Sequence, residues 1–301
     1  MEIAYQVFLY TAEEKSITGG AMRLGVSQQC ASQHIRNLER KLGASLLCRH
    51  PFALTEAGKR LAEGLQHLAL EERQIQNAVE EITLGERGIL RIGCNATRAR
   101  LLFPDVLVKY RKIYPHIQFL FFFGDTAELI HQIYNGKLDL VIGVNQEPQN
   151  QLERIPLVEE KIFFVCQLNL VEQGMTKKSK NQSLTLQEIS QLPFCGNLPE
   201  STLTQLLRRQ AARENVTLEP AYVCSDYQYQ VDLCQAGLCG CFLPETLLSL
   251  LKGKNVRIWP LKIEEQLHID LIHPVASIRP QYEKTLIRMI REEYLSKTGS
   301  L

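Results

Sequence analysis

The 301-residue chain contains one tryptophan and four methionines, and its formal net charge is only +1. It has no apolar run near the roughly 18–20 residues that cross a bilayer, so no membrane span is expected. Near its start, Glu2, Glu13 and Glu14 stand where a secretion signal would have a basic and then an apolar segment. These absences predict a cytoplasmic protein without a membrane partner.

Motifs for catalysis or cofactor binding are also missing. The seven histidines show no H-x-x-H or H-E-x-x-H spacing, and no phosphate-binding loop, Gly-rich dinucleotide fingerprint or G-x-S-x-G occurs. The nine cysteines match neither a disulfide framework nor a zinc site, which predicts buried thiols in a reducing compartment. We therefore predict a protein that is not an enzyme and that uses no metal or cofactor.

The residues that are present have a globular composition, with 45% hydrophobic and 22% charged side chains. Residues 1–60 carry eight Lys and Arg against five Asp and Glu, whereas the remainder carries 26 against 28. A basic end on a slightly acidic body favours a nucleic-acid-binding end joined to a separate body. Chance is the alternative explanation of so small an excess.

Two short helices joined by a glycine turn are predicted in the basic end. Ser16 caps the first helix and Gly25 ends it, while Ser27 opens the second helix, which runs to Leu42. This punctuation is typical of a helix-turn-helix, here over about residues 16–35.

The second of these helices carries polar side chains near its start, where a helix that enters the major groove meets the base edges. We predict that this side contacts double-stranded DNA through Ser27, Gln28, Gln29, Ser32, Gln33 and Arg36. The opposite side is predicted to face inward through Cys30, Ala31, Ile35 and Leu38. Without the helix-turn-helix frame, a solvated helix face would be the preferred interpretation of the polar set.

A wing and a long helix are expected next. Residues typical of strands on both sides of Pro51 predict a hairpin between Leu47 and Thr55. The helix predicted from Glu56 to Leu84 has apolar residues at spacings of four, three and seven, namely Leu61, Leu65, Leu68, Ile75, Val79 and Ile82. So narrow a stripe favours a partner helix, and therefore a homo-oligomer, over packing on the helix's own domain.

After residue 88, apolar strands alternate with helices, which predicts parallel sheets covered on both faces. We expect two α/β lobes, with crossovers near Pro156–Lys161 and Glu264–Leu267. Helix N-termini that meet in the cleft between such lobes favour a small anionic ligand. The predicted lining residues are Asn95, Thr97, Arg98, Thr126, Asn145, Cys195, Asn197 and Ser225. Among them, Arg98 is either the partner of a ligand carboxylate or an ordinary surface arginine.

The N-terminal seventy residues resemble the LysR family of transcriptional regulators. The resemblance is carried there by Val26-Ser27-Gln28, Leu38-Glu39, Leu42-Gly43 and Leu54-Thr55-Glu56-Ala57-Gly58, and more weakly later by Leu90-Arg91-Ile92-Gly93 and Gly136-Lys137-Leu138-Asp139-Leu140. It implies a winged helix-turn-helix, a dimerising linker helix and a two-lobed effector domain like periplasmic binding proteins. It also implies a homodimer or homotetramer that binds DNA and responds to a small-molecule effector.

The expected boundaries follow from this organisation. They are 1–58 for the DNA-binding domain, 59–87 for the linker helix and 88–301 for the effector domain. Within the effector domain, lobe I takes about 88–160 and 267–301, and lobe II about 161–266. The family likeness adds the wing residues Arg49 and His50 to the predicted DNA contacts. Gln33 stands where the family commonly has arginine, which favours adenine over guanine.

Two alternatives stay open at this point. Cys195 lies close to where peroxide-sensing members of the family carry their reactive cysteine, so the signal could be oxidation, although no second cysteine follows at the expected short distance. The other alternative is a solute-binding or enzymatic α/β protein whose N-terminal helices only dimerise it.

Overall fold

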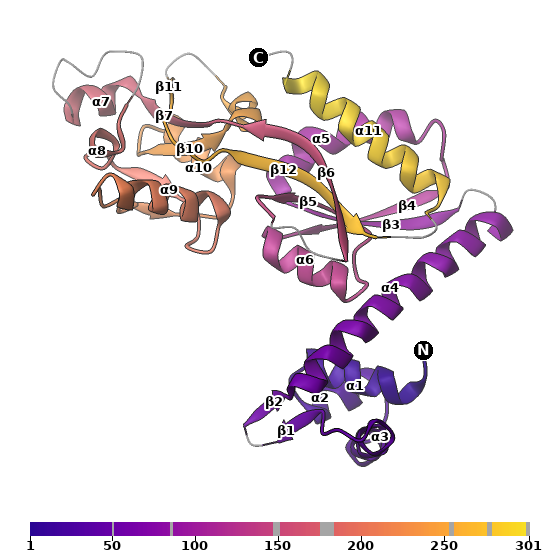
Figure 1. The fold of residues 1–301 in the computed structure, drawn as a ribbon. Coiled ribbons are helices and arrows are strands. Elements are labelled where there is room, and N and C mark those ends of the chain that lie inside the picture. The colour runs from indigo at the N-terminus through magenta and orange to yellow at the C-terminus, as the bar shows by residue number, and fades with distance from the viewer. Residues whose placement is uncertain are drawn as a thin grey trace.

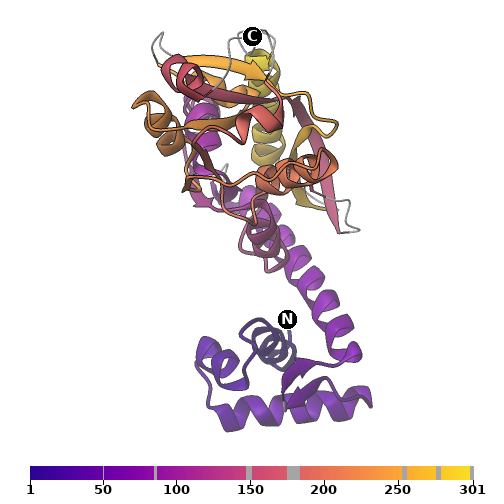
Figure 2. The ribbon, with the colours of Figure 1, turned by 90° about the vertical axis from the view of Figure 1, so that its left-hand side faces the viewer.

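The computed structural model describes residues 1–49, 51–84, 87–146, 151–174, 184–252, 256–275 and 279–298. In chain order it consists of a small helical domain, a long helix and a two-lobed α/β body (Figure 1). The turned view shows the small domain and the body at opposite ends of the long helix (Figure 2). Within the described ranges, no helix combines the length and apolarity that a membrane crossing requires.

The N-terminal domain is a winged helix-turn-helix of α1 (Ile3–Glu13), α2 (Ile17–Leu24), α3 (Gln28–Leu42), β1 (Leu47–Arg49) and β2 (Phe52–Leu54). Both predicted caps are confirmed: Ser16 Oγ accepts a hydrogen bond from Gly19 N–H, and Ser27 Oγ accepts one from Cys30 N–H. Gly25 ends α2 at φ = 69°, a left-handed conformation that glycine adopts without strain. Local chemistry therefore sets the limits of the two helices of the motif.

The long helix α4 (Glu56–Leu84) leads from this domain to the body. Its first apolar residues, Leu61 and Leu65, pack in the core of the N-terminal domain, so the prediction that they face a partner helix is wrong. Leu68, Ile75 and Val79 are exposed by 59%, 52% and 52%. The side chain of Ile82 lies outside the described part of the chain. Only the later part of the stripe is thus available to a second helix.

Lobe I contains a five-stranded sheet in the order β4-β3-β5-β12-β6. Its elements are β3 (Gly88–Cys94), α5 (Ala96–Tyr110), β4 (Ile117–Phe123), α6 (Thr126–Tyr134), β5 (Leu140–Val144), β6 (Leu152–Glu160), β12 (Leu267–Pro274) and α11 (Gln281–Thr298). β3, β4 and β5 are parallel, but β12 runs antiparallel to β5 and β6. The prediction of a wholly parallel sheet is wrong because β6 leaves the lobe and β12 returns to it, so these two strands run in opposite directions.

Lobe II contains a second sheet in the order β11-β7-β10-β8-β9. Its elements are β7 (Ile162–Gln167), α7 (Leu168–Gly174), α8 (Leu186–Ile189), β8 (Phe194–Gly196), α9 (Thr202–Arg213), β9 (Tyr222–Val223), α10 (Tyr227–Gln235), β10 (Gly240–Pro244), the 3-10 helix η2 (Glu245–Leu250) and β11 (Val256–Pro260). β7 is antiparallel to both neighbours, so this sheet is mixed as well. The surface loop predicted over residues 173–183 lies almost entirely outside the described residues.

One correction matters for the cleft. The first helix of lobe I begins at Ala96, only two residues after β3 ends, whereas the run of large apolar residues that marks it in the sequence begins at Leu101. Asn95 Oδ1 accepts a hydrogen bond from Thr97 N–H at 2.9 Å and so caps the earlier turn. Because of this cap, the residues that follow β3 belong to a helix start and not to a loop.

Candidate functional site

The predicted DNA-contacting side of α3 points away from the domain core. Gln28, Gln29, Gln33 and Arg36 are exposed, as is Ser27, whose hydroxyl oxygen is used as the cap, and Ser32 is half-buried. On the other side, Ala31, Ile35 and Leu38 are at most 2% exposed. Cys30 is exposed, so its predicted inward position is wrong. Cys30 precedes Ala31 by one residue and therefore lies about 100° around the helix from the buried stripe.

Hydrogen bonds between side chains hold part of this surface in place. Arg36 Nη2 donates to Gln33 Oε1 at 2.8 Å, and Gln33 Nε2 donates to Asn37 Oδ1 at 2.9 Å. Arg40 Nη1 also donates to Asn37, at 3.4 Å. Asn37 and Arg40 were missed by the sequence analysis, although their spacing of four residues from Gln33 and from Arg36 is a usable signal. The outer side of α3 is therefore polar and cationic, as phosphate and base contacts require.

The wing contacts stay predictions. Arg49 is the last residue of β1, but its side chain lies outside the described part of the chain, and His50 lies outside the described residues altogether.

The second candidate site is a cleft of about 130 Å³ between the lobes. It is bordered by the N-terminal ends of four helices, two from each lobe: α5 and α6 from lobe I, and α9 and α10 from lobe II. α5 is capped by Asn95, and α10 is capped by Asp226 Oδ1, which accepts from Tyr229 N–H at 3.0 Å. The other two helix starts have no side-chain cap, since neither Asp125 before α6 nor Ser201 before α9 makes one. Two sets of unsatisfied N–H groups thus border one cleft, an arrangement that binds anions.

The structure brings five of the eight predicted effector residues to this cleft, namely Asn95, Arg98, Thr126, Asn197 and Ser225. The hydroxyl oxygen of Thr126 accepts a hydrogen bond from Val144 N–H at 3.0 Å, which ties the start of α6 to the end of β5. Asn197 Oδ1 accepts from Gln230 Nε2 at 2.8 Å, so its amide is also held in position.

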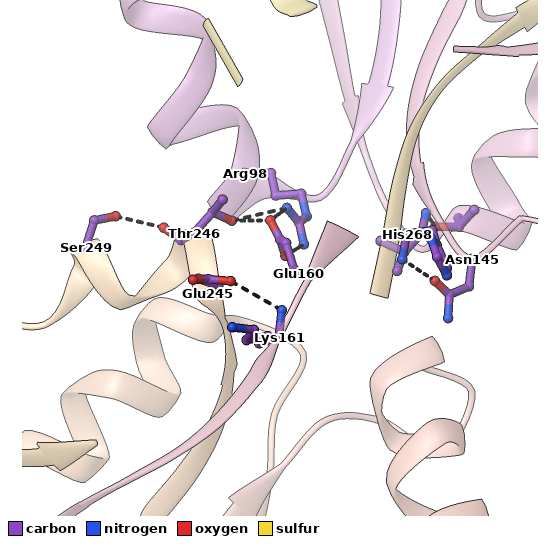
Figure 3. A network of polar contacts seen from close by, with 10 residues as sticks. Arg98, Asn145, Glu160, Lys161, Glu245, Thr246, Ser249 and His268 are labelled. Atoms are coloured by element: carbon purple, nitrogen blue, oxygen red, sulfur yellow. Dashed lines mark hydrogen bonds and ion pairs between the residues drawn. The ribbon is translucent and has the colours of Figure 1, made fainter. Parts of the chain in front are cut away.

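Three predicted residues do not line the cleft. Thr97 is 1% exposed on the inner side of α5. Asn145 ties the end of β5 to the returning crossover: its Oδ1 accepts from His268 N–H at 2.6 Å, and its Nδ2 donates to Gln266 O at 3.3 Å (Figure 3). Cys195 is fully buried within lobe II, and burial raises the pKa of its thiol to about 11. The structure therefore places these three residues away from this cleft, and direct effector contact through them stays a prediction.

Arg98 lines the cleft but is not a free cation. Its Nη1 and Nη2 donate to Glu160 Oε1 and Oε2 at 2.9 and 2.8 Å, and the arginine is only 5% exposed (Figure 3). Burial is the largest single influence and lowers the pKa of Arg98, but attraction to Glu160 and Tyr294 together with hydrogen bonds to both outweighs it, and the net shift is upward. The Thr246 hydroxyl of lobe II donates to Glu160 Oε1 at 2.5 Å, so this buried group connects the lobes. Arg98 is therefore neither a free partner for a ligand carboxylate nor an ordinary surface arginine, the two alternatives that the sequence left open.

Several lining residues escaped the sequence analysis. Ser201, Thr202 and Tyr227 all border the cleft. The helix α9 begins at Thr202, directly after Ser201. A serine followed by threonine before an apolar stripe is the start signal that would have found it. Tyr227 is half-buried, and burial raises the pKa of its hydroxyl to about 12, so the hydroxyl stays protonated and can donate.

Comparison with known proteins identifies one family in each part of the chain. The family described as "Bacterial regulatory helix-turn-helix protein, lysR family" matches residues 4–59, and "LysR substrate binding domain" matches residues 84–295. The chain is 26% identical over 216 residues to a probable RuBisCO transcriptional regulator of Thalassiosira pseudonana, which covers 70% of this chain and 69% of that protein. It is 26% identical over 163 residues to the regulator CysL of Bacillus subtilis, about half (54%) of either chain.

Solved structures show the same fold. A full-length OxyR variant from Pseudomonas aeruginosa aligns with a TM-score of 0.64 at 16% identity, over 97% of this chain and 95% of that one. Full-length CbnR in complex with its target DNA aligns with a TM-score of 0.55 at 16% identity, over 97% and 100%. The resemblance seen in the sequence is confirmed: the chain belongs to the LysR family of DNA-binding transcriptional regulators.

Proposed function

We propose that this protein regulates transcription by binding double-stranded DNA through α3 and the wing, under the control of a small anionic effector held between its lobes. The observation that carries the effector half is the meeting of two uncapped helix N-termini, one from each lobe, at one cleft. An anion between them would interact with both lobes at once. Its binding would therefore favour a closed arrangement of the lobes over an open one.

The DNA half rests on the exposed polar side of α3. Residues 1–58 would form the DNA-binding domain, 59–87 the linker and 88–301 the effector domain. The CbnR structure was determined with its target DNA, and the same fold here supports an equivalent use of this domain. A regulator of this kind acts on the chromosome, so we place it in the cytoplasm.

We further propose a homodimer or homotetramer in which the α4 helices pair. Leu68 and Ile75 support this because they are seven residues apart, lie on one side of the helix and are more than half exposed. Large apolar side chains repeated in this way on a solvent face mark an interaction surface.

Redox sensing at Cys195 is less well supported. Thiolate is the reactive form of cysteine, and full burial with a pKa raised to about 11 disfavours the thiolate. The rival in which the N-terminal helices only dimerise an enzyme or solute-binding protein gives no reason for the polar, cationic side of α3.

The DNA half is tested with the full chain and the duplex upstream of its own coding region. Footprinting should show an interrupted dyad, since dimeric helix-turn-helix proteins bind half-sites one or more helical turns apart. Gln28→Ala should lose about 1–3 kcal/mol of discrimination between this duplex and random DNA. Gln76→Ala, an exposed glutamine on α4, is the matched control. Equal weakening of specific and random binding by Gln28→Ala would remove Gln28 from base recognition.

The effector half is tested by thermal shift with small organic acids and their neutral amides. The acids should stabilise the protein and the amides should not. Thr202→Pro removes one N–H from the start of α9 at a position where proline is tolerated, whereas Thr202→Ala keeps this donor. We expect Thr202→Pro to weaken acid binding more than Thr202→Ala does. Stabilisation by amides alone, or equal binding by the two variants, would contradict an anion site at this helix start.

A further inference from the structure

The linker helix α4 contacts lobe I of its own chain through a few specific side chains. Gln66 Nε2 donates to Asn135 Oδ1 at 3.1 Å, and Arg73 Nε lies 3.7 Å from Asp139 Oδ1. Between these two contacts Leu70 is 5% exposed, and a Cβ atom on Gly136 would lie 3.9 Å from Leu70 Cδ2. These partners in lobe I all belong to the turn between α6 and β5, so α4 is docked on one short segment.

The same two elements reach the interlobe cleft at their other ends. α6 begins at Thr126 and β5 ends at Val144, both of which line the cleft, and Val144 N–H donates to the Thr126 hydroxyl. Between the two ends, Leu129, Ile133 and Val141 pack in one buried cluster. A helix and a strand packed in this way move together, because a dense core deforms little. A shift at the start of α6 therefore reaches the turn that holds α4. Figure 1 shows α6 beside the linker helix α4.

We propose that the pair α6–β5 is a lever between the cleft and the linker helix, and that Gln66 and Arg73 are the positioning residues through which an anion in the cleft sets the orientation of the DNA-binding domain. This inference rests on the proposed function and adds the route by which its two sites communicate.

The charges at the docked turn support a contact that can be released. Burial lowers the pKa of Arg73 and raises that of Asp139, and in each case burial outweighs the attraction between the two groups. A pair whose desolvation exceeds its attraction adds little stability and is better explained by the geometry that it selects. Asp139 also accepts from Arg91 N–H at 2.8 Å, so the carboxylate is held in place on lobe I while the arginine of α4 can leave.

The test uses the reciprocity of coupling: if the cleft affects DNA binding, then DNA affects the cleft. Hydrogen exchange of the full chain is measured with and without the duplex identified by footprinting, and read on peptides from α6 and β5. In the wild type, DNA should change the exchange rates in these peptides by about five-fold or more, the lower end of typical coupling factors.

Variants in α4 separate the lever from a general effect of DNA binding. The double variant Gln66→Ala/Arg73→Ala should bind the duplex yet lose most of the exchange change in α6 and β5. Arg73→Lys keeps the charge and should preserve the change, as should the control Gln76→Ala. Neither single substitution touches the core of lobe I, and Gln66→Ala alone should give a partial loss.

Two results overturn the lever: a wild-type protein that binds the duplex with no change in these peptides, or a double variant with the full change. A wild-type protein that fails to bind any duplex overturns the proposed function itself, and the lever with it.

Discussion

The two ends of lobe I each carry an arginine–carboxylate pair that joins the lobe to another part of the chain. At the cleft end, Arg98 and Glu160 make two bonds of 2.8 and 2.9 Å, and their side chains are 6% and 1% exposed. At the linker end, Arg73 and Asp139 approach only to 3.7 Å, with side chains 23% and 10% exposed. The Arg98–Glu160 pair is bidentate and buried, whereas the Arg73–Asp139 pair has a single contact and is partly exposed to solvent.

The difference shows which joint is fixed and which can open. At the cleft end the pKa of Arg98 is raised, because attraction to Glu160 and Tyr294 and hydrogen bonds to both together outweigh burial, whereas at the linker end burial prevails and the pKa of Arg73 is lowered. The bidentate geometry also adds directional strength. We infer that the lobes pivot around a firm contact, while the linker helix is held by a weak one.

The largest effect is expected from breaking the firm pair. Arg98→Met leaves Glu160 buried without its partner, which should cost about 3–5 kcal/mol of unfolding free energy. Urea unfolding of the full chain measures it. Arg98→Met/Glu160→Gln removes both charges and should recover a large part of the loss. A loss below about 1 kcal/mol in the single variant would show that the pair is no firmer than a surface salt bridge.

A smaller effect is expected from the third member of the group at the cleft end. Thr246→Val removes the hydroxyl that donates to Glu160 Oε1 from lobe II. A hydrogen bond to a charged group contributes about 1.5–3 kcal/mol, so the variant should lose stability in that range. Thr217→Val, an exposed threonine of the same lobe, is the matched control. Equal stability of Thr246→Val and Thr217→Val would show that Thr246 does not strengthen the Arg98–Glu160 contact between the lobes.

The linker end is expected to be the pH-sensitive one. Glu283 is buried beside Arg279, and burial together with nearby Asp139 raises its pKa from 4.5 to about 7. Between these pH values the folded protein holds a proton that the unfolded chain has lost, so stability should fall as the pH rises from 4.5 to 7 and then level off.

Glu283→Gln should reduce the fall in stability across this pH range. Each kcal/mol of that fall corresponds to about 2–4 °C in Tm. Differential scanning at pH 5, 6 and 7 reads the slope directly. The exposed Glu292→Gln should leave the slope as it is in the wild type. An unchanged slope in Glu283→Gln would place the pH dependence elsewhere in the molecule.

The smallest effect on stability is expected from the weak pair. Arg73→Ala should change the unfolding free energy by less than about 1 kcal/mol, as for other partly exposed ion pairs. The same urea titration that tests Arg98→Met gives this value. A loss as large as that of Arg98→Met would make the linker contact a structural anchor and contradict its release during regulation.

The sequence by itself determined the parts that depend on near neighbours. Ser16, Gly25 and Ser27 set the limits of the helix-turn-helix because caps and left-handed glycines act within one helical turn. The helical period likewise predicted the polar side of α3, with Cys30 as the misplaced residue. The hydroxyl, amide and arginine side chains that follow strands β3, β5 and β8 were likewise recognised as candidates for the cleft, because each lies a few residues after a strand that the sequence pattern predicts.

Only the tertiary structure decided what those side chains do. Arg98 is neutralised by Glu160, which is 62 residues away, and Asn145 is bound to His268 across 123 residues. The proposed anion site instead consists of backbone N–H groups at α6 and α9, whose availability depends on a missing side-chain cap and not on a residue type. Whether a charged side chain is free to bind a ligand depends on its burial and on the partners that the folded chain brings beside it. The order of residues in the sequence contains neither.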